Sequence, residues 1–99
     1  MKTAKLRIVG DMTIYQAREL KRSVLSRLEQ SPRLEIDLSA VTDLDSAGVQ
    51  ILLMAKREAC ARQGELRIVG QSRAVLDVFG LFDLGAHFGD GLAKSSRSR

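Results

Sequence analysis

The sequence predicts one α/β domain, in which helices pack on a mixed, mostly parallel β-sheet of about four strands. The first observation is an alternation of two patterns: short segments alternate between apolar and polar residues, as strands do, and longer segments repeat apolar residues every three or four positions, as helices do. The second is size, since 99 residues, of which 44% are hydrophobic, suit a single core. Strands separated by helices are typical of crossover connections, which leave neighbouring strands parallel.

The chain begins with a predicted strand and a predicted helix. Residues 5–9 (KLRIV) alternate as a strand does, and Gly10-Asp11 indicates a turn at its end. Thr13 and Gln16 have the spacing of a capping box, in which the threonine hydroxyl accepts from the third helical amide and the glutamine reaches back. A helix is therefore expected over residues 17–29, where apolar residues recur at helical spacing.

The middle of the chain predicts a second strand and a longer helix. Ser31-Pro32 ends the first helix, and residues 34–38 (LEIDL) then alternate as a strand. Residues 39–44 are interpreted as a loop that opens directly into a helix over residues 46–63. Gly64 is expected to take the left-handed backbone conformation that commonly ends a helix.

The last third of the chain predicts shorter elements. Residues 66–69 (LRIV) are expected to form a third strand, and Ser72 to cap a short helix that Gly80 closes. Residues 84–88 are interpreted as a fourth strand at the edge of the sheet. These elements complete the predicted sheet.

The positive charge of the chain is concentrated at its end. The net charge is +4, but three of the 16 basic residues follow position 93, so residues 1–93 carry 13 basic against 12 acidic side chains. The domain is accordingly assigned to residues 1–92, and residues 93–99 are expected to form a flexible basic tail. The first helix has a basic run that is typical of a solvated face: Arg18, Lys21, Arg22 and Arg27. Together with an aromatic content of only 4%, this distribution argues against nucleic-acid binding.

Cysteine and histidine usage argues against catalysis and metal binding. Cys60 is the single cysteine, which excludes an internal disulfide and a cysteine-based metal cluster, and His87 is the single histidine. We expect Cys60 to be a buried helix residue. No apolar stretch approaches the roughly 20 residues that span a bilayer, and the N-terminus lacks the features of a signal peptide. The sequence predicts a cytoplasmic, non-enzymatic protein without cofactor, metal or membrane insertion.

The most informative segment is the loop that leads into the predicted central helix. Asp45 is well placed as the N-cap, which leaves Ser46 in the first turn, and Gly48 removes a side chain where a partner or the neighbouring strand could approach. Phosphorylation of Ser46 would add about 1.5–2 negative charges, which a helix N-terminus tolerates. A docked partner would meet that charge beside Asp43 and Asp45. Ser46 is thus a candidate switch, although Asp and Ser at a helix start also serve as simple caps.

The order of elements and several short motifs are shared with one known family. These motifs are Gly10-Asp11, Ile36-Asp37-Leu38-Ser39 with Val41-Thr42, Asp45-Ser46-Ala47-Gly48, Gly64 before residues 66–69, residues 72–75, and Gly80-Leu81-Phe82. Over residues 6–88 the pattern resembles the STAS domain, named for sulfate transporters and anti-sigma factor antagonists. The resemblance implies the fold of that family. Because position 43 is commonly apolar in the family, Asp43 adds a charge to the loop.

The resemblance also implies a non-enzymatic protein that binds a partner. In anti-sigma factor antagonists, the serine of the Asp-Ser-x-Gly motif is phosphorylated by a GHKL-type kinase that is also the anti-sigma factor. The unmodified domain binds this kinase, and the phosphorylated domain releases it. Carried over, Ser46 is the phosphorylation site, and the partner-binding residues are Asp11, Asp43, Asp45, Ser46, Ala47 and Gly48. The implied partner is an anti-sigma factor with serine kinase activity, and formation of a homodimer stays open.

Two alternative functions stay open within the resemblance. Short stand-alone members also serve as cytoplasmic subunits of ABC transporters for lipid trafficking, where the domain binds the ATPase. Other members with a Leu-Asp-Ser/Thr-Ala-Gly motif resemble small accessory proteins of chemotaxis-type signalling kinases. A neighbouring gene for an anti-sigma kinase, a permease with an ATPase, or a chemotaxis kinase would separate the three functions.

Overall fold

Three strands and three helices alternate along residues 2–81, the part of the chain that the computed structural model describes. The elements are β1 (Ala4–Met12), α1 (Ala17–Gln30), β2 (Arg33–Leu44), α2 (Ser46–Ala61), β3 (Glu65–Gln71) and α3 (Arg73–Leu81). The sheet order is β1-β2-β3, and both pairs are parallel. The predicted α/β class is confirmed, with three parallel strands in the described residues where about four were expected. The edge strand predicted over residues 84–88, the domain boundary at residue 92 and the tail over residues 93–99 lie outside the described residues.

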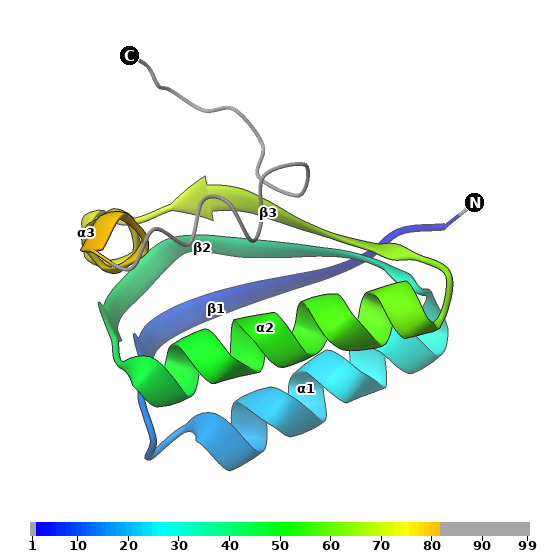
Figure 1. The fold of residues 1–99 in the computed structure, drawn as a ribbon, viewed down its shortest axis with the longest axis horizontal. Helices are drawn as coiled ribbons and strands as arrows, with labels where there is room; N and C mark the ends of the chain where they lie inside the picture. The colour runs from blue at the N-terminus through cyan, green and yellow to red at the C-terminus, as the bar shows by residue number, and fades with distance from the viewer. Residues whose placement is uncertain (1, 82–99) are drawn as a thin grey trace.

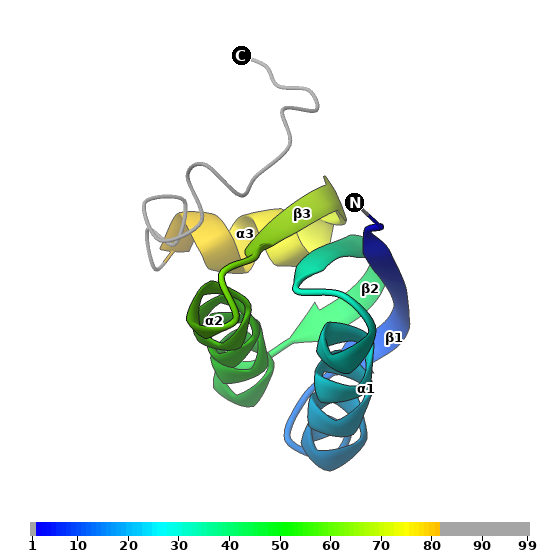
Figure 2. The same ribbon diagram turned by 90° about the vertical axis from the view of Figure 1, so that its right-hand side faces the viewer.

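The helices occupy two different places around the sheet. α1 and α2 lie side by side against one face of it (Figure 1), whereas α3 lies across the carboxyl end of β3 and contacts β2 (Figure 2). The core is the apolar layer between the helix pair and the sheet, and its fully buried side chains include Met12, Ile36, Leu38, Leu52 and Ile68. None of the helices within residues 2–81 combines the length and the apolar character needed to cross a membrane.

All three strands are longer than the sequence predicts, since β3 spans Glu65–Gln71 where residues 66–69 were expected. β1 and β2 are extended further, and the sheet contains bulges between them. β1 continues through Gly10-Asp11 as far as Met12, and β2 includes residues 39–44. The register between β1 and β2 shifts twice, each time with one extra residue in β2. Gly10 has φ +94°, a left-handed conformation that glycine adopts readily at a bulge. The predicted turn and the predicted loop are therefore wrong. In β2 the extra residues break the strict alternation by which a strand is recognised, and in β1 a glycine of positive φ followed by an aspartate has the composition of a turn.

The start of α1 contains half of the predicted capping box. The Gln16 side-chain oxygen accepts from the backbone amide of Thr13 (3.1 Å) and from its hydroxyl (2.6 Å). The Thr13 hydroxyl, however, accepts from the Tyr15 amide at 3.4 Å, while the Gln16 amide donates to the Thr13 carbonyl oxygen at 2.9 Å. Residues 13–16 therefore form a turn ahead of the helix, and α1 begins only at Ala17.

The end of α2 corrects the role predicted for Gly64. Gln63, and not Gly64, has the left-handed conformation, with φ +63°. The amides of Gln63 and Gly64 donate to the carbonyl oxygens of Cys60 (3.0 Å) and Ala59 (2.8 Å), which is the pattern of a Schellman motif. Glycine is needed at position 64 for another reason, because a Cβ there would lie 2.0 Å from the Pro32 carbonyl oxygen.

Smaller predictions about the helices also have definite outcomes. Cys60 is exposed and not buried, because Ala59 takes the core-facing position and the next residue is rotated by about 100° around the helix.

α3 continues past Gly80, which therefore does not close it. The predicted cap of α3 is confirmed, since the Ser72 hydroxyl accepts from the Val75 amide at 3.2 Å. The single histidine, at position 87, lies outside the described residues.

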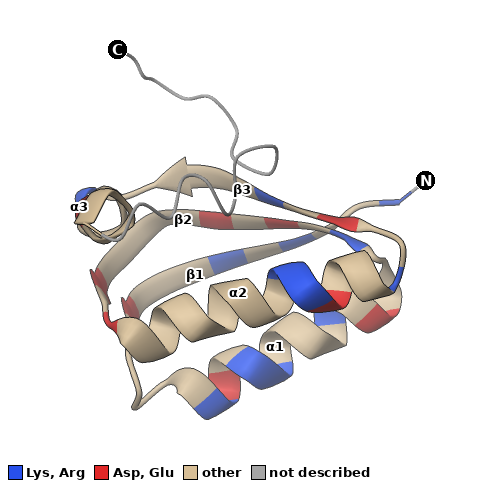
Figure 3. Cartoon of the chain, in the orientation of Figure 1, with Lys and Arg blue, Asp and Glu red and all other residues tan. Residues whose placement is uncertain are grey.

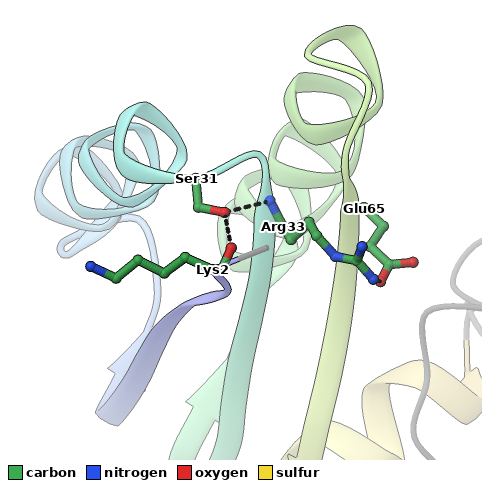
Figure 4. A network of polar contacts seen from close by, with 4 residues as sticks. All are labelled: Lys2, Ser31, Arg33 and Glu65. Carbon is green, nitrogen blue, oxygen red and sulfur yellow. Dashed lines mark hydrogen bonds and ion pairs between the residues drawn. The ribbon is translucent and has the colours of Figure 1, made fainter.

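A polar network ties the amino ends of the three strands together (Figure 4). The buried Ser31 donates its hydroxyl to the Lys2 carbonyl oxygen (2.5 Å) and accepts from the Arg33 amide (3.2 Å). The Arg33 guanidinium forms an ion pair with Glu65 at 2.9 Å. Because the strands are parallel, their carboxyl ends lie together at the opposite edge of the sheet, where open α/β folds commonly bind their ligands.

Candidate functional site

The carboxyl ends of β1 and β2 meet the first turn of α2 at one edge of the sheet (Figure 1). The Asp45 amide, between β2 and α2, donates to the carbonyl oxygen of Met12 at the end of β1 (3.3 Å). We call this region the Ser46 edge. It contains the six residues predicted for partner binding: Asp11, Asp43, Asp45, Ser46, Ala47 and Gly48.

Asp45 connects the first turn of α2 to the segment between β1 and α1 through its two carboxylate oxygens. Oδ1 accepts from the Gly48 amide (3.0 Å), which is the N-cap bond predicted from the sequence. Oδ2 accepts from the Ile14 amide (3.1 Å) in the segment between β1 and α1. Hydrogen bonds from these amides, that of Gly48 foremost, lower the pKa of Asp45 below its ordinary value. The side chain is therefore a carboxylate at neutral pH.

Exposure changes sharply over the first three residues of α2. Ser46 is exposed, Ala47 is half-buried and Gly48 is buried. A Cβ on Gly48 would lie 2.3 Å from the Met12 carbonyl oxygen and 2.5 Å from Cδ1 of Leu44. The neighbouring strands fill the space that this glycine leaves, so the residue packs the helix start against β1.

Two further carboxylates face each other across the strand pair. Asp11 and Asp43 are direct partners in the register of β1 and β2, and both are exposed. Asp11 Oδ1 accepts from the Thr42 hydroxyl (2.9 Å), and Asp43 Oδ1 accepts from the Leu44 amide (2.9 Å). Neither forms an ion pair within residues 2–81. Figure 3 shows the acidic residues of this edge in red. Like charges on paired positions repel each other, so this pair favours a basic group on a partner.

Asp43→Asn is expected to raise the free energy of unfolding by roughly half a kcal/mol, the usual scale of interactions between exposed charges. The substitution removes the charge opposite Asp11 and keeps an oxygen that can accept from the Leu44 amide. Urea unfolding at low salt measures the gain. In salt near 1 M, where the Debye length is about 3 Å, the gain should largely disappear. No gain at low salt, or an equal gain at both concentrations, would contradict the repulsion.

Sequence reasoning missed the apolar part of the Ser46 edge. Ile14 is 67% exposed and Tyr15 is 90% exposed. Ile14 stands three residues before Ala17 and matches the apolar spacing of α1, but the helix begins only at Ala17, so the turn leaves Ile14 in solvent. Tyr15 does not match the apolar spacing of α1, and this mismatch is the signal in the sequence that could have indicated its exposure. Thr42 was named only as part of a family motif and not as a site residue, because its bond to Asp11 depends on the pairing of the strands.

The side chains of the Ser46 edge suit binding and modification. Within residues 2–81, no group of three His, Cys, Asp or Glu side chains is arranged to hold a metal ion. The exposed Ser46 hydroxyl at a helix N-terminus can carry a phosphoryl group, whose charge the terminal amides stabilise. Exposed apolar side chains bordered by charged ones are typical of surfaces that bind proteins.

Comparison with known proteins gives a family and a fold. The family model described as "Mlab, STAS domain" matches residues 1–92. The chain is similar to an anti-sigma factor antagonist from Mycobacterium paratuberculosis, at 26% identity and a TM-score of 0.79, over 94% of this chain and 78% of that one. In fold it is also similar to the anti-sigma factor antagonist SpoIIAA in its unphosphorylated form, at 19% identity and a TM-score of 0.70, over 98% of this chain and 85% of that one. Among curated proteins, none matches the chain.

Proposed function

The chain belongs to the STAS domain family, and from this membership and the Ser46 edge we propose that it is a non-catalytic regulatory protein of the anti-sigma factor antagonist type. In this proposal, the unmodified Ser46 edge binds a protein partner, an anti-sigma factor that is also a serine kinase. Phosphorylation of Ser46 by that kinase ends the binding. The similarity in fold to an anti-sigma factor antagonist at 26% identity supports the class of partner.

The observation that carries the proposal is the position of Ser46. Its side chain is exposed at the first residue of α2, where a kinase can reach it. The backbone around it is held by other residues: the cap bond joins Asp45 to the Gly48 amide, and Gly48 packs against Met12. Because the Ser46 side chain is not part of this anchoring, its modification can change the surface while the domain stays folded.

The charges at this edge support release of the partner. A phosphoserine brings about 1.5–2 negative charges to a surface that already carries Asp11, Asp43 and Asp45. Within the free domain, the N-terminus of α2 stabilises such a charge by roughly 0.3–1 kcal/mol. A partner packed over Ser46 would have to remove water from this charge, and burial of an ion without matched hydrogen bonds costs several kcal/mol. The phosphoryl charge is therefore tolerated while the Ser46 edge faces water, and it disfavours the complex in which a partner covers that edge.

Phosphorylation by the GHKL-type anti-sigma kinases of the source organism is the direct test. Incubation of the purified chain with such a kinase and ATP should add one phosphoryl group, which peptide mass spectrometry should place on Ser46. Ser46→Ala should abolish the incorporation. Ser26→Ala, which removes an exposed serine of α1, is the matched control and should leave it unchanged.

Binding to the same kinase gives a second readout. Calorimetry should show that Ser46→Ala binds as tightly as the unmodified chain, and that Ser46→Asp binds at least about tenfold more weakly. Both variants should melt at nearly the same temperature. Equal binding by the two variants, or phosphorylation at another serine, would overturn the proposal. Binding to a transporter ATPase or a chemotaxis-type kinase that does not respond to Ser46 would favour one of the alternative functions.

A further inference from the structure

The surface around Ile14 and Tyr15 carries opposite charges on its two sides. One side is acidic and belongs to the Ser46 edge: Asp11, Asp43 and Asp45. The other side is the basic start of α1: Arg18, Lys21 and Arg22. Apart from the half-buried Asp45, all of these side chains are exposed. The bond from the Ile14 amide to Asp45 holds the acidic side directly against the apolar pair. We call these eight residues the bipolar surface. In Figure 3 the ribbon is red at the ends of β1 and β2 and blue at several positions along α1.

The basic side of the bipolar surface is not neutralised by the described part of the chain. Arg22 follows Arg18 by four residues, a spacing that places these two side chains on one flank of α1. Within residues 2–81, none of the three basic side chains forms an ion pair. Glu19 is the one acidic residue among them, so positions 18–22 keep a net charge of +2.

We propose that the bipolar surface binds a second copy of this chain around a two-fold axis. In such a dimer both copies use the same surface, and each contact occurs twice in reversed order. The acidic side of one copy then faces the basic side of the other, while Ile14 and Tyr15 of both copies pack at the centre. This arrangement pairs charges that form no ion pair within residues 2–81, and it removes exposed apolar surface from water.

A second copy fits this surface better than a polyanion does. A nucleic acid or an anionic membrane would be attracted to the basic side, but it would extend over the acidic side and be repelled there. A second copy is attracted by both sides of the surface, because its basic side faces the acidic side of the first copy and its acidic side faces the basic side. Because the surface is small, the expected dimer is weak and depends on concentration. It also covers the Ser46 edge, so a second copy and any other protein partner exclude each other there.

Sedimentation equilibrium of the full chain at low salt, from micromolar to millimolar concentration, tests this inference. The wild-type chain should become dimeric as its concentration rises, and salt should dissociate the dimer. Arg18→Glu/Arg22→Glu and, separately, Asp11→Lys/Asp43→Lys should each weaken self-association at least about tenfold, since like charges then face each other. An equimolar mixture of the two variants should associate again, because their surfaces are complementary.

Arg57→Glu/Arg67→Glu is the matched control for the basic side. It changes the net charge by the same amount at exposed positions outside the bipolar surface, and it should leave self-association unchanged. Thermal melting followed by circular dichroism verifies that each variant is folded. A wild-type chain that stays monomeric, a control that weakens association equally, or a mixture that does not associate would overturn the inference.

Binding of a polyanion is the alternative result. A chain that stays monomeric and binds an oligonucleotide or anionic vesicles through Arg18 and Arg22 would overturn the proposed self-association and favour a polyanion as the ligand of this surface. The inference concerns the unmodified chain and does not depend on the proposed function. Since neither a kinase nor a phosphate enters the measurement, a monomeric chain would leave the proposal for Ser46 standing.

Discussion

Gly48→Ala is expected to lower the free energy of unfolding by about 2 kcal/mol. The new Cβ would lie 2.3 Å from the Met12 carbonyl oxygen and 2.5 Å from Cδ1 of Leu44. The carbonyl oxygen belongs to the backbone of a strand end and cannot move aside alone, so the cost should reach the upper part of the usual range for overpacking, about 3 kcal/mol. The better helix propensity of alanine offsets about 1 kcal/mol of this. Urea unfolding measures the difference.

Gly80 provides the matched control for this substitution. It also lies in a helix, α3, but a Cβ there would meet no atom within 4 Å among the described residues. Gly80→Ala should therefore raise the free energy of unfolding by up to about 1 kcal/mol, the intrinsic preference of a helix for alanine. A Gly48→Ala variant that gains stability as Gly80→Ala does would contradict the close packing of α2 against β1.

The same substitution connects the packing of the fold with the proposed function. The first turn of α2 is held against the strands by Gly48, and the Gly48 amide is also the donor in the cap bond to Asp45. Moving this turn away from Met12 shifts Ser46 relative to Asp11 and Asp43. Gly48→Ala should therefore weaken binding to the partner at temperatures where it is still folded, although no charge and no exposed side chain has changed.

Features that depend on a few neighbouring residues could be predicted from the sequence. Asp45 and Ser72 were identified as caps because a capping side chain accepts from an amide three residues ahead, and both bonds are present. The apolar spacing that predicted a helix over residues 17–29 also fits the burial observed in α1, where Val24 and Leu28 are buried. Ser46 could be placed at a helix start for the same local reason.

Features that depend on strand pairing could not be predicted. The register that sets Asp11 opposite Asp43 passes through two shifts, and no local pattern indicates where an extra residue enters β2. The exposure of Ile14 also has a non-local cause, because the Ile14 amide donates to Asp45, 31 residues away in the sequence, in addition to the local bonds of the turn before α1. The acidic residues of the Ser46 edge could thus be named from the sequence. The pairing of Asp11 with Asp43 and the exposed apolar side chains of Ile14 and Tyr15 beside them could not be predicted.

Gly64→Ala is expected to have a still larger effect, a loss of about 3 kcal/mol or more. The Cβ would lie 2.0 Å from the Pro32 carbonyl oxygen and 2.4 Å from its carbon, and both atoms are backbone. The same oxygen accepts from the Glu65 amide (3.1 Å) where the pairing of β2 with β3 begins. Position 64 lies outside the helices, so no gain in helix propensity offsets the overpacking. Urea unfolding measures the loss, and a stability equal to that of the wild type would contradict the close approach.

Gln63→Gly distinguishes this contact from a backbone requirement at the end of α2. Position 63 has the left-handed conformation, so glycine there relieves roughly 1 kcal/mol of strain and adds a similar conformational entropy to the unfolded chain. Its net effect should be small, and the double variant Gln63→Gly/Gly64→Ala should be as unstable as Gly64→Ala alone. Recovery in the double variant would show that the helix end, and not the contact with Pro32, requires the glycine. Because this contact lies at the amino ends of the strands, Gly64→Ala should leave partner binding per folded molecule unchanged, whereas Gly48→Ala should weaken it.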